Sequence, residues 1–121
     1  MRFLLIHYID ESLLGWDENG DEVTDTEEWI RFDQELEAWD ADMKSQGILV
    51  GGGALQSARK TMTLRVRSGE LMVTDGPFAE TKEQVAGYCI LECASLEAAI
   101  EVSSRHPTAK IGTFELRPFQ E

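Results

Sequence analysis

The residues best suited to chemistry gather in one short run around a Gly-Pro bend at residues 76–77. Proline has a fixed φ and no N–H, and glycine adopts dihedral angles closed to other residues, so the chain must turn sharply after Asp75. With Glu80 and Lys82 close behind it, the Asp75 carboxylate suits proton transfer or the binding of a small polar group. The alternative is that Asp75 only caps the turn by accepting bonds from nearby backbone N–H groups.

Two histidines and a tyrosine complete the candidate set, because histidine changes its charge near neutral pH. His7 lies in an apolar, strand-like run, where it is either a hydrogen-bonded core residue or a base facing a cavity. His106 precedes Pro107 at a predicted helix end, where it either interacts with the last carbonyls or belongs to a site. Lys82 near two carboxylates would keep them ionised, which suits a base better than an acid. The predicted catalytic residues are Asp75, His7 and His106, and the predicted ligand-binding residues are Glu80, Lys82 and Tyr88.

Several other kinds of chemistry lack their motifs. Two histidines are too few for a three-histidine metal site, and the sequence contains no HExxH motif. Cys89 and Cys93 lie four apart in a strand-like run, about 13 Å from each other, so they cannot pair and are expected to be buried. No GxSxG elbow is present, and Gly51–Gly53 is not followed by the Lys-Ser/Thr of a phosphate loop. We therefore predict no metal, no cofactor and no covalent catalysis.

Length and charge indicate the kind of molecule. The 121 residues fit a single domain over 1–121, and the net charge of −12 would repel nucleic acids and anionic membranes. The apolar opening is too short to span a bilayer and lacks a signal-peptide cleavage site, so a cytoplasmic location is expected. Asp10 to Asp42 holds 14 acidic residues and only Arg31 as a basic one, whereas the next basic residues form a local patch. That patch, which would favour an anionic molecule near a pocket, comprises Lys44, Arg59, Lys60, Arg65 and Arg67.

The periodicity of apolar residues predicts the elements that position these side chains. Residues 2–9 form a strand that is apolar on both faces, and a mobile polar loop follows from Asp10 to Val23. A helix begins at Thr24 or Asp25, with a capping acid three residues later, and ends at Gly47. Its apolar stripe, which should face the core, comprises Trp29, Phe32, Leu36, Trp39 and Met43. The remaining predicted elements are strands from Ile48, at 61–67, 71–74, 87–94 and 111–119, and a helix over 96–105 capped by Ser95.

This order of elements predicts an α+β fold, a ferredoxin-like split βαβ sandwich with an inserted β-hairpin at 61–74. In such a sandwich the helices cover one face of the sheet. The central strands are apolar on both faces, so the second face also needs a cover. A homodimer packed sheet to sheet is the simplest way to supply it.

The Asp75-Gly76-Pro77-Phe78 bend with Glu80-Thr81-Lys82-Glu83 resembles the DGPF-type branch of the YCII-related proteins. The resemblance covers nearly the whole chain, including Leu4-Leu5-Ile6, Gly51 to Leu55, Gly87-Tyr88, Leu96-Glu97-Ala98-Ala99 and Glu115-Leu116-Arg117-Pro118. It implies a ferredoxin-like fold that forms a dimeric α+β barrel, with a site between sheet and helices. It also implies a largely undefined activity that is often described through a His-Asp pair. No histidine lies between Thr24 and Gly47, where many relatives carry theirs, so His7 or His106 would have to substitute.

The leading hypothesis is a homodimer that binds a small polar or anionic ligand in a cleft, with proton transfer or elimination as the reaction if it is an enzyme. The cleft would be lined by Asp75, Glu80, Lys82, His7 and Tyr88. The resemblance also links DGPF-type members with extracytoplasmic-type sigma factors, so the second hypothesis is a regulatory module whose acidic stretch docks such a factor. A third is a purely structural dimer whose bend only stiffens the hairpin.

Overall fold

The structure, a computed structural model, describes residues 1–21 and 26–121. Its strands are β1 Arg2–Ile9, β2 Leu49–Ala54, β3 Met62–Arg67, β4 Glu70–Asp75, β5 Gln84–Glu92 and β6 Thr113–Pro118. Its helices are α1 Glu27–Ser45 and α2 Leu96–Ser104, with short 3₁₀ turns η1 Glu11–Leu13, η2 Ala58–Lys60 and η3 Pro107–Lys110. No helix among the described residues combines the length and the apolar character needed to cross a membrane.

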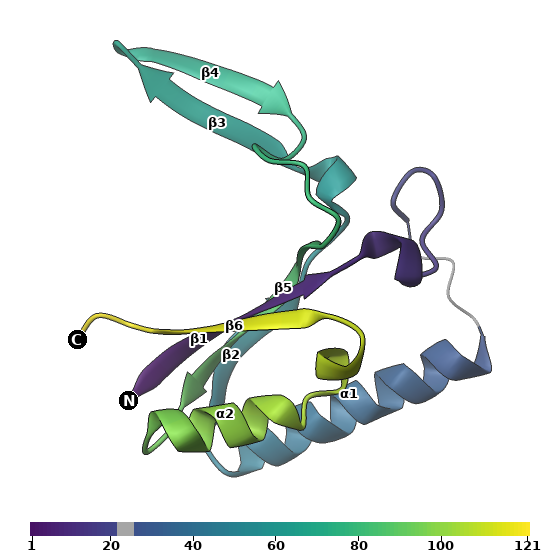
Figure 1. Cartoon of the computed structure of the whole chain (residues 1–121), viewed down its shortest axis with the longest axis vertical. Helices are drawn as coiled ribbons and strands as arrows, with labels where there is room; N and C mark the ends of the chain where they lie inside the picture. Colours follow the sequence, from purple (N-terminus) through teal and green to yellow (C-terminus); the bar gives the residue numbers. More distant parts are fainter. Residues whose placement is uncertain (22–25) are drawn as a thin grey trace.

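Four strands form the main sheet in the order β2-β5-β1-β6, with every neighbouring pair antiparallel. Both helices lie on one face of this sheet, and no helix of the described residues lies over the other face (Figure 1). This is the predicted split βαβ sandwich with helices on one side. The dimeric barrel stays a prediction.

Helix α1 starts and stops where its sequence provides caps. The Thr26 hydroxyl accepts a hydrogen bond from the Trp29 N–H at 3.3 Å, and Glu27 and Glu28 lie in the first turn, where the helix dipole favours acids. Gly47, with a φ of 73°, takes the left-handed conformation that ends the helix as predicted. The two predicted caps, Thr24 and Asp25, lie outside the described residues.

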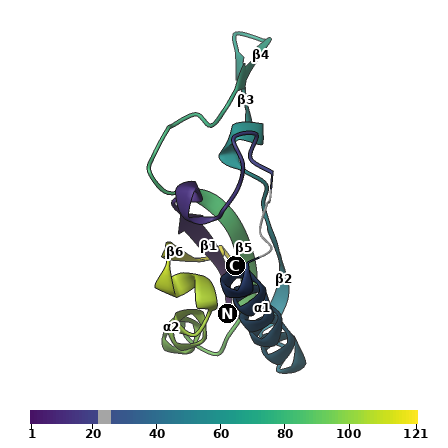
Figure 2. The same cartoon turned by 90° about the vertical axis from the view of Figure 1, so that its right-hand side faces the viewer.

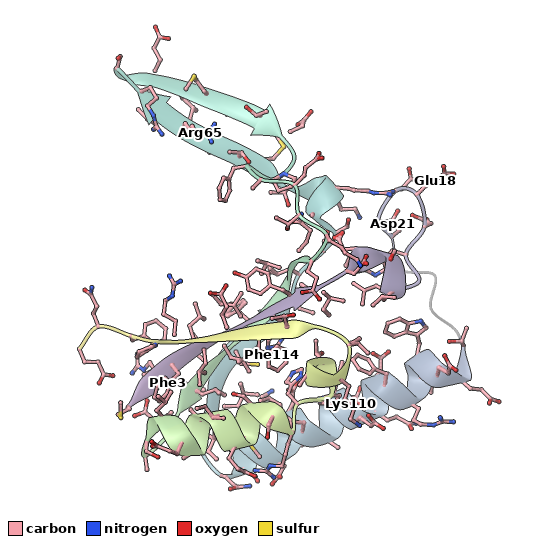
Figure 3. All side chains as sticks on the ribbon, in the orientation of Figure 1. Phe3, Glu18, Asp21, Arg65, Lys110 and Phe114 are labelled. Atoms are coloured by element: carbon pink, nitrogen blue, oxygen red, sulfur yellow. The ribbon has the colours of Figure 1, made fainter. Side chains whose placement is uncertain are left out.

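The hydrophobic core lies between the sheet and the helices. Its largest fully buried side chains are Phe3, Leu5, Met43 and Leu91. Trp39 of α1 donates its Nε1–H to the Val102 carbonyl at 3.1 Å, which ties α1 to α2 across the core. Phe3 and Phe114, labelled in Figure 3, show how β1 and β6 lie over the helices.

Strands β3 and β4 pair only with each other and project away from the main sheet, as both views show (Figures 1 and 2). The predicted turn joins them, with Ser68 and Gly69 at φ 52° and 79°. We call residues 62–75 the arm. The sequence indicated the hairpin, but it did not indicate that the hairpin would leave the body of the protein.

The described part of the predicted mobile loop, residues 10–21, is attached to the base of the arm. The Glu11 carboxylate accepts hydrogen bonds from the Ser57 hydroxyl at 2.6 Å and from the Ala58 N–H at 2.9 Å. Arg59 donates to the Glu18 carbonyl, and Lys60 pairs with Asp21. These bonds order a segment whose polar composition alone suggested mobility.

Truncating Leu5 tests the core. Leu5→Ala leaves a cavity beneath β1 that the packed neighbours cannot fill, so we expect the free energy of unfolding in urea to fall by about 2–5 kcal/mol. Ile30→Ala on the exposed side of α1 is the control and should change it by less than about 0.5 kcal/mol. Equal losses in the two variants would contradict this description of the core.

Candidate functional site

A cavity of about 640 Å³ lies between the main sheet and α1. Trp29, Phe32 and Leu36 of α1 line one side of it, and the glycines at 51–53 of β2 line the other. The apolar stripe of α1 was predicted to face the core along its whole length. Instead only Trp39 and Met43 are buried, and the three earlier stripe residues remain half-buried along the cavity.

Gly52 lets β2 lie close against β5 beside the cavity. Gly52 pairs with Cys89 of β5 and has a φ of 146°, which side chains rarely adopt. A Cβ there would lie 2.5 Å from the Tyr88 carbonyl oxygen, so no larger residue fits. The glycine run lacks the motif of a phosphate loop, and at Gly52 it serves close backbone packing beside the cavity.

Three buried side chains lie together at the cavity: His7, Cys89 and His106. One nitrogen or sulfur atom from each falls within 4.8 Å of the others. Strand alternation puts His7 on the same face of β1 as Phe3 and Leu5, which is the face that packs on the helices. The His7 Nε2 lies 3.6 Å from the Cys89 Sγ, and the centroids of the two imidazoles are 4.6 Å apart.

Aromatic neighbours hold both imidazoles in place. Phe114 of β6 stacks on His7 with centroids 4.7 Å apart and planes inclined by 29°. Trp39 of α1 meets His106 edge-on at 4.6 Å and 66°. Because these rings belong to the packed layer between sheet and helices, the histidines have little room to reorient.

Burial keeps the cluster uncharged at neutral pH. It lowers the pKa of His7 to about 4, and burial together with the nearby His7 lowers the pKa of His106 to about 3. Burial, with the negative charge of Asp40, raises the pKa of the Cys89 thiol to about 12. Both histidines are therefore neutral, and Cys89 is a thiol rather than a nucleophilic thiolate.

One hydrogen bond fixes the tautomer of His106. Its Nδ1 accepts the Thr108 backbone N–H at 3.1 Å, so in the neutral ring the proton must sit on Nε2. His106 is thus a hydrogen-bond donor, whereas neutral His7 keeps one nitrogen as an acceptor. The two-histidine, one-cysteine set resembles a metal site in its donor types, but a metal at Nε2 would need the proton on Nδ1, where Thr108 already donates. The cluster fits hydrogen bonding better than metal binding.

The structure brings together some of the predicted site residues and separates others. His7, His106 and Tyr88 all line the cavity, although the His106 ring caps η3 instead of the end of α2. Lys82 lines a second, more open cavity with Tyr8 and Glu115 on the far side of β1. Asp75 and Glu80 are exposed and line neither of these two cavities. The expected cleft that gathers all of these residues is not formed within one described chain.

Sequence reasoning did not place Asp40 or Cys89 in the site, and it assigned Lys44 only to a basic patch. Asp40 and Lys44 of α1 line the cavity, and burial raises the pKa of the half-buried Asp40 carboxyl while nearby Lys44 opposes the rise. The sequence did contain a signal for Asp40. It follows Leu36 of the apolar stripe by four residues, so it lies on the same face of the helix, where a charged side chain is unusual. Cys89 had no such signal, because its nearness to His7 and His106 depends on strand register and on the path of the chain after α2.

Comparison with known proteins places this geometry in a family. The family model of the YCII-related domain matches residues 1–121, the entire chain. The chain belongs to the YCII-related family. Uncharacterized protein R00369 of Rhizobium meliloti (strain 1021) is 34% identical over 123 residues, which span 98% of this chain and 91% of that protein. The DGPF-type branch predicted from the bend stays a prediction.

A solved structure shares the fold of this YCII-related chain. It is 5-chloro-2-hydroxyhydroquinone dehydrochlorinase (TftG) from Burkholderia phenoliruptrix AC1100, in complex with 2,5-dihydroxybenzoquinone. The TM-score is 0.51 over 100% of this chain and 95% of that one, with 14% identity. At this identity the likeness shows the fold alone.

The lowered pKa values of the histidines predict a loss of stability in acid. Between the ordinary pKa of 6.5 and the folded values, the unfolded chain takes up protons that the folded chain refuses, so the free energy of unfolding falls as the pH is lowered. Each histidine adds a slope of about 1.4 kcal/mol per pH unit in this range. Urea denaturation from about pH 7 to about pH 5 should show a shallower slope for His106→Gln than for the wild type. Identical slopes would refute the burial of His106 as a neutral ring.

Gly87→Ala tests the position of the His7 imidazole. A Cβ at Gly87 would lie 3.3 Å from the His7 Nδ1 and 3.0 Å from the Gly53 carbonyl oxygen, so we expect the imidazole to shift. Its ring resonances in a ¹H–¹⁵N NMR spectrum should move clearly from their wild-type positions. Gly53→Ala, whose Cβ would meet nothing within 4 Å, is the matched control and should leave them in place. Unchanged His7 resonances in Gly87→Ala would contradict the geometry.

Proposed function

We propose that this YCII-related protein binds a small, planar molecule with polar or anionic oxygens in the cavity between the sheet and α1, and catalyses proton transfer or elimination on it. The observation that carries the proposal is a pair of buried, neutral histidines at a cavity, one of which is fixed as a donor by Thr108. A buried pair of this kind supplies an acceptor and a donor within one small volume.

The walls of the cavity favour a flat molecule with oxygen substituents. Trp16, Trp29 and Phe32 offer aromatic surface, and the Lys44 ammonium offers a charge partner for an anionic oxygen. Asp33 and Asp40 line the same cavity, so a hydroxyl group also finds acceptors there. A ligand of mixed character fits these walls better than a purely apolar one.

The roles of the histidines follow from their protonation. In an elimination, the free nitrogen of His7 accepts a proton from the substrate carbon, and the electrons of that bond form the new double bond. The leaving group departs with its bonding electrons and is stabilised by a hydrogen bond from the His106 Nε2–H. TftG, which shares the fold, is a dehydrochlorinase by its printed title and holds a dihydroxyquinone, which supports this class of ligand and reaction.

The proposal assigns Asp75, Glu80 and Lys82 no step in the reaction within one chain. Asp75, Glu80 and Lys82 line other surfaces of the chain, so within one chain they have no route to the histidine pair. Activity assays of Asp75→Asn and Lys82→Ala test whether these two residues take part in the reaction or stand outside the site. Full activity in both variants would restrict the site to the cavity beneath α1.

Calorimetric titration with 2,5-dihydroxybenzoquinone tests the proposed site. We expect saturable binding by the wild type and at least about tenfold weaker binding by His106→Gln, which cannot keep the same donor in place. Glu97→Gln, on the exposed first turn of α2, is the matched control and should bind like the wild type. Release of chloride from a chlorinated hydroxyhydroquinone tests the elimination itself and should fall in His7→Gln. Equal binding and turnover in all four proteins would refute the assignment.

A further inference from the structure

The loop that follows β1, residues 10–21, supplies part of the wall of the cavity between the sheet and α1. Leu14 is buried and Trp16 is half-buried, and both line that cavity. The facing walls belong to α1 and to the main sheet, whose backbone hydrogen bonds fix them. A loop has no such ladder of bonds, so the position of Trp16 depends on the contacts that hold residues 10–21 in place.

Ser57, which precedes η2, holds this loop near both of its ends. At the first end, the Glu11 carboxylate accepts the Ser57 hydroxyl at 2.6 Å through Oε1 and the Ala58 N–H at 2.9 Å through Oε2. At the second end, a Cβ on Gly20 would lie 2.7 Å from the Ser57 Cβ, so the loop backbone packs directly on the serine. Ser57 is only 3% exposed. The loop therefore closes on one buried residue, with Trp16 between the two contacts.

The direction of these hydrogen bonds makes the charge of Glu11 essential to them. The Ser57 hydroxyl accepts the Arg59 N–H at 3.1 Å, so its own proton can point at Glu11. Two donors thus meet two carboxylate oxygens, and hydrogen bonds to an ionised acceptor are the stronger kind. A glutamine in the same place would keep the shape but turn an NH₂ group towards one of those donors.

We propose that Glu11 is a positioning residue of the ligand site, whose carboxylate fixes the loop so that Trp16 forms a preordered aromatic wall for the ring of a flat ligand. Glu11 itself lines neither of the two cavities, so it acts through Trp16. This role rests on the proposed function, because it takes the cavity beneath α1 as the ligand site.

A preordered wall changes affinity more than it changes the chemical step. When Trp16 is already in place, the ligand contacts the indole without first ordering a loop, and the cost of that ordering would otherwise weaken binding. The histidine pair is held separately, by Phe114, by Trp39 and by the Thr108 N–H. Loss of the Glu11 contacts should therefore raise the Kd and the KM and leave kcat nearly unchanged.

Fluorine NMR of the ligand-free protein tests whether Glu11 holds Trp16. Labelling with 5-fluorotryptophan gives one resonance for each of the three tryptophans, which Trp16→Phe and Trp29→Phe assign. In Glu11→Gln we expect the Trp16 resonance to move towards the position of free 5-fluorotryptophan. The resonance of Trp39, which is buried in the core, should stay and show that the fold is intact. Glu18→Gln is the matched control, because it removes the same charge from an exposed position of the same loop (labelled in Figure 3).

Calorimetric titration with 2,5-dihydroxybenzoquinone tests whether the effect of Glu11 reaches the ligand. Glu11→Gln should weaken binding at least about fivefold, and Glu18→Gln should bind like the wild type. In a Trp16→Ala background Glu11→Gln should weaken binding little further, because the wall that Glu11 positions is already gone. In assays of chloride release from a chlorinated hydroxyhydroquinone, Glu11→Gln should raise the KM and keep kcat within about twofold of the wild type.

The outcomes separate the role of Glu11 from the proposed function. A wild type that binds the quinone, together with a Trp16 resonance that stays in place in Glu11→Gln, would overturn the role of Glu11 and leave the proposed function standing. Equal weakening by Glu11→Gln with and without the Trp16 indole would overturn the route through Trp16. A wild type that fails to bind would refute the proposed function and, with it, any role of Glu11 in ligand binding, even if the resonance moves.

Discussion

The burial of one face of β1 is the constraint on which the rest of the structure depends. This strand is central, pairs with β5 and β6, and presents Phe3, Leu5 and His7 to the helices in strict alternation. The same packing that excludes water from Leu5 strips it from His7 two residues later. The candidate site is thus continuous with the hydrophobic core, and its neutral histidines follow from that continuity.

The fold could be predicted because its signals are local. Caps, glycine stops and alternation marked the helices, the hairpin and the four sheet strands, and their order allowed few topologies. The tip of the arm shows the limit of such signals. Ser68 and Gly69 set a tight turn, but whether a hairpin lies on the sheet or leaves it depends on tertiary contacts that no local pattern encodes.

The site could be predicted only in part for the same reason. His7 was readable as a strand histidine with two possible roles, and the structure places it both in the packed layer and beside a cavity. The path of the chain after α2 brings His106 to His7, and the register of β1 and β5 brings Cys89 there. No spacing in the sequence therefore reveals that the three residues form a group. Asp75 stood out for its bend, yet that bend follows the arm and lies away from the histidines. Turn chemistry marks a change of direction without revealing what lies beside it.

The glycine at position 52 has a consequence for how such a pocket can diversify. Because a Cβ at this position would meet the backbone of β5, the wall formed there is fixed main chain and presents no side chain to vary. The facing residues Trp29, Phe32 and Leu36 carry no such restriction. Substitutions at these three helix positions can therefore change the shape of the cavity without altering the strand that packs at Gly52.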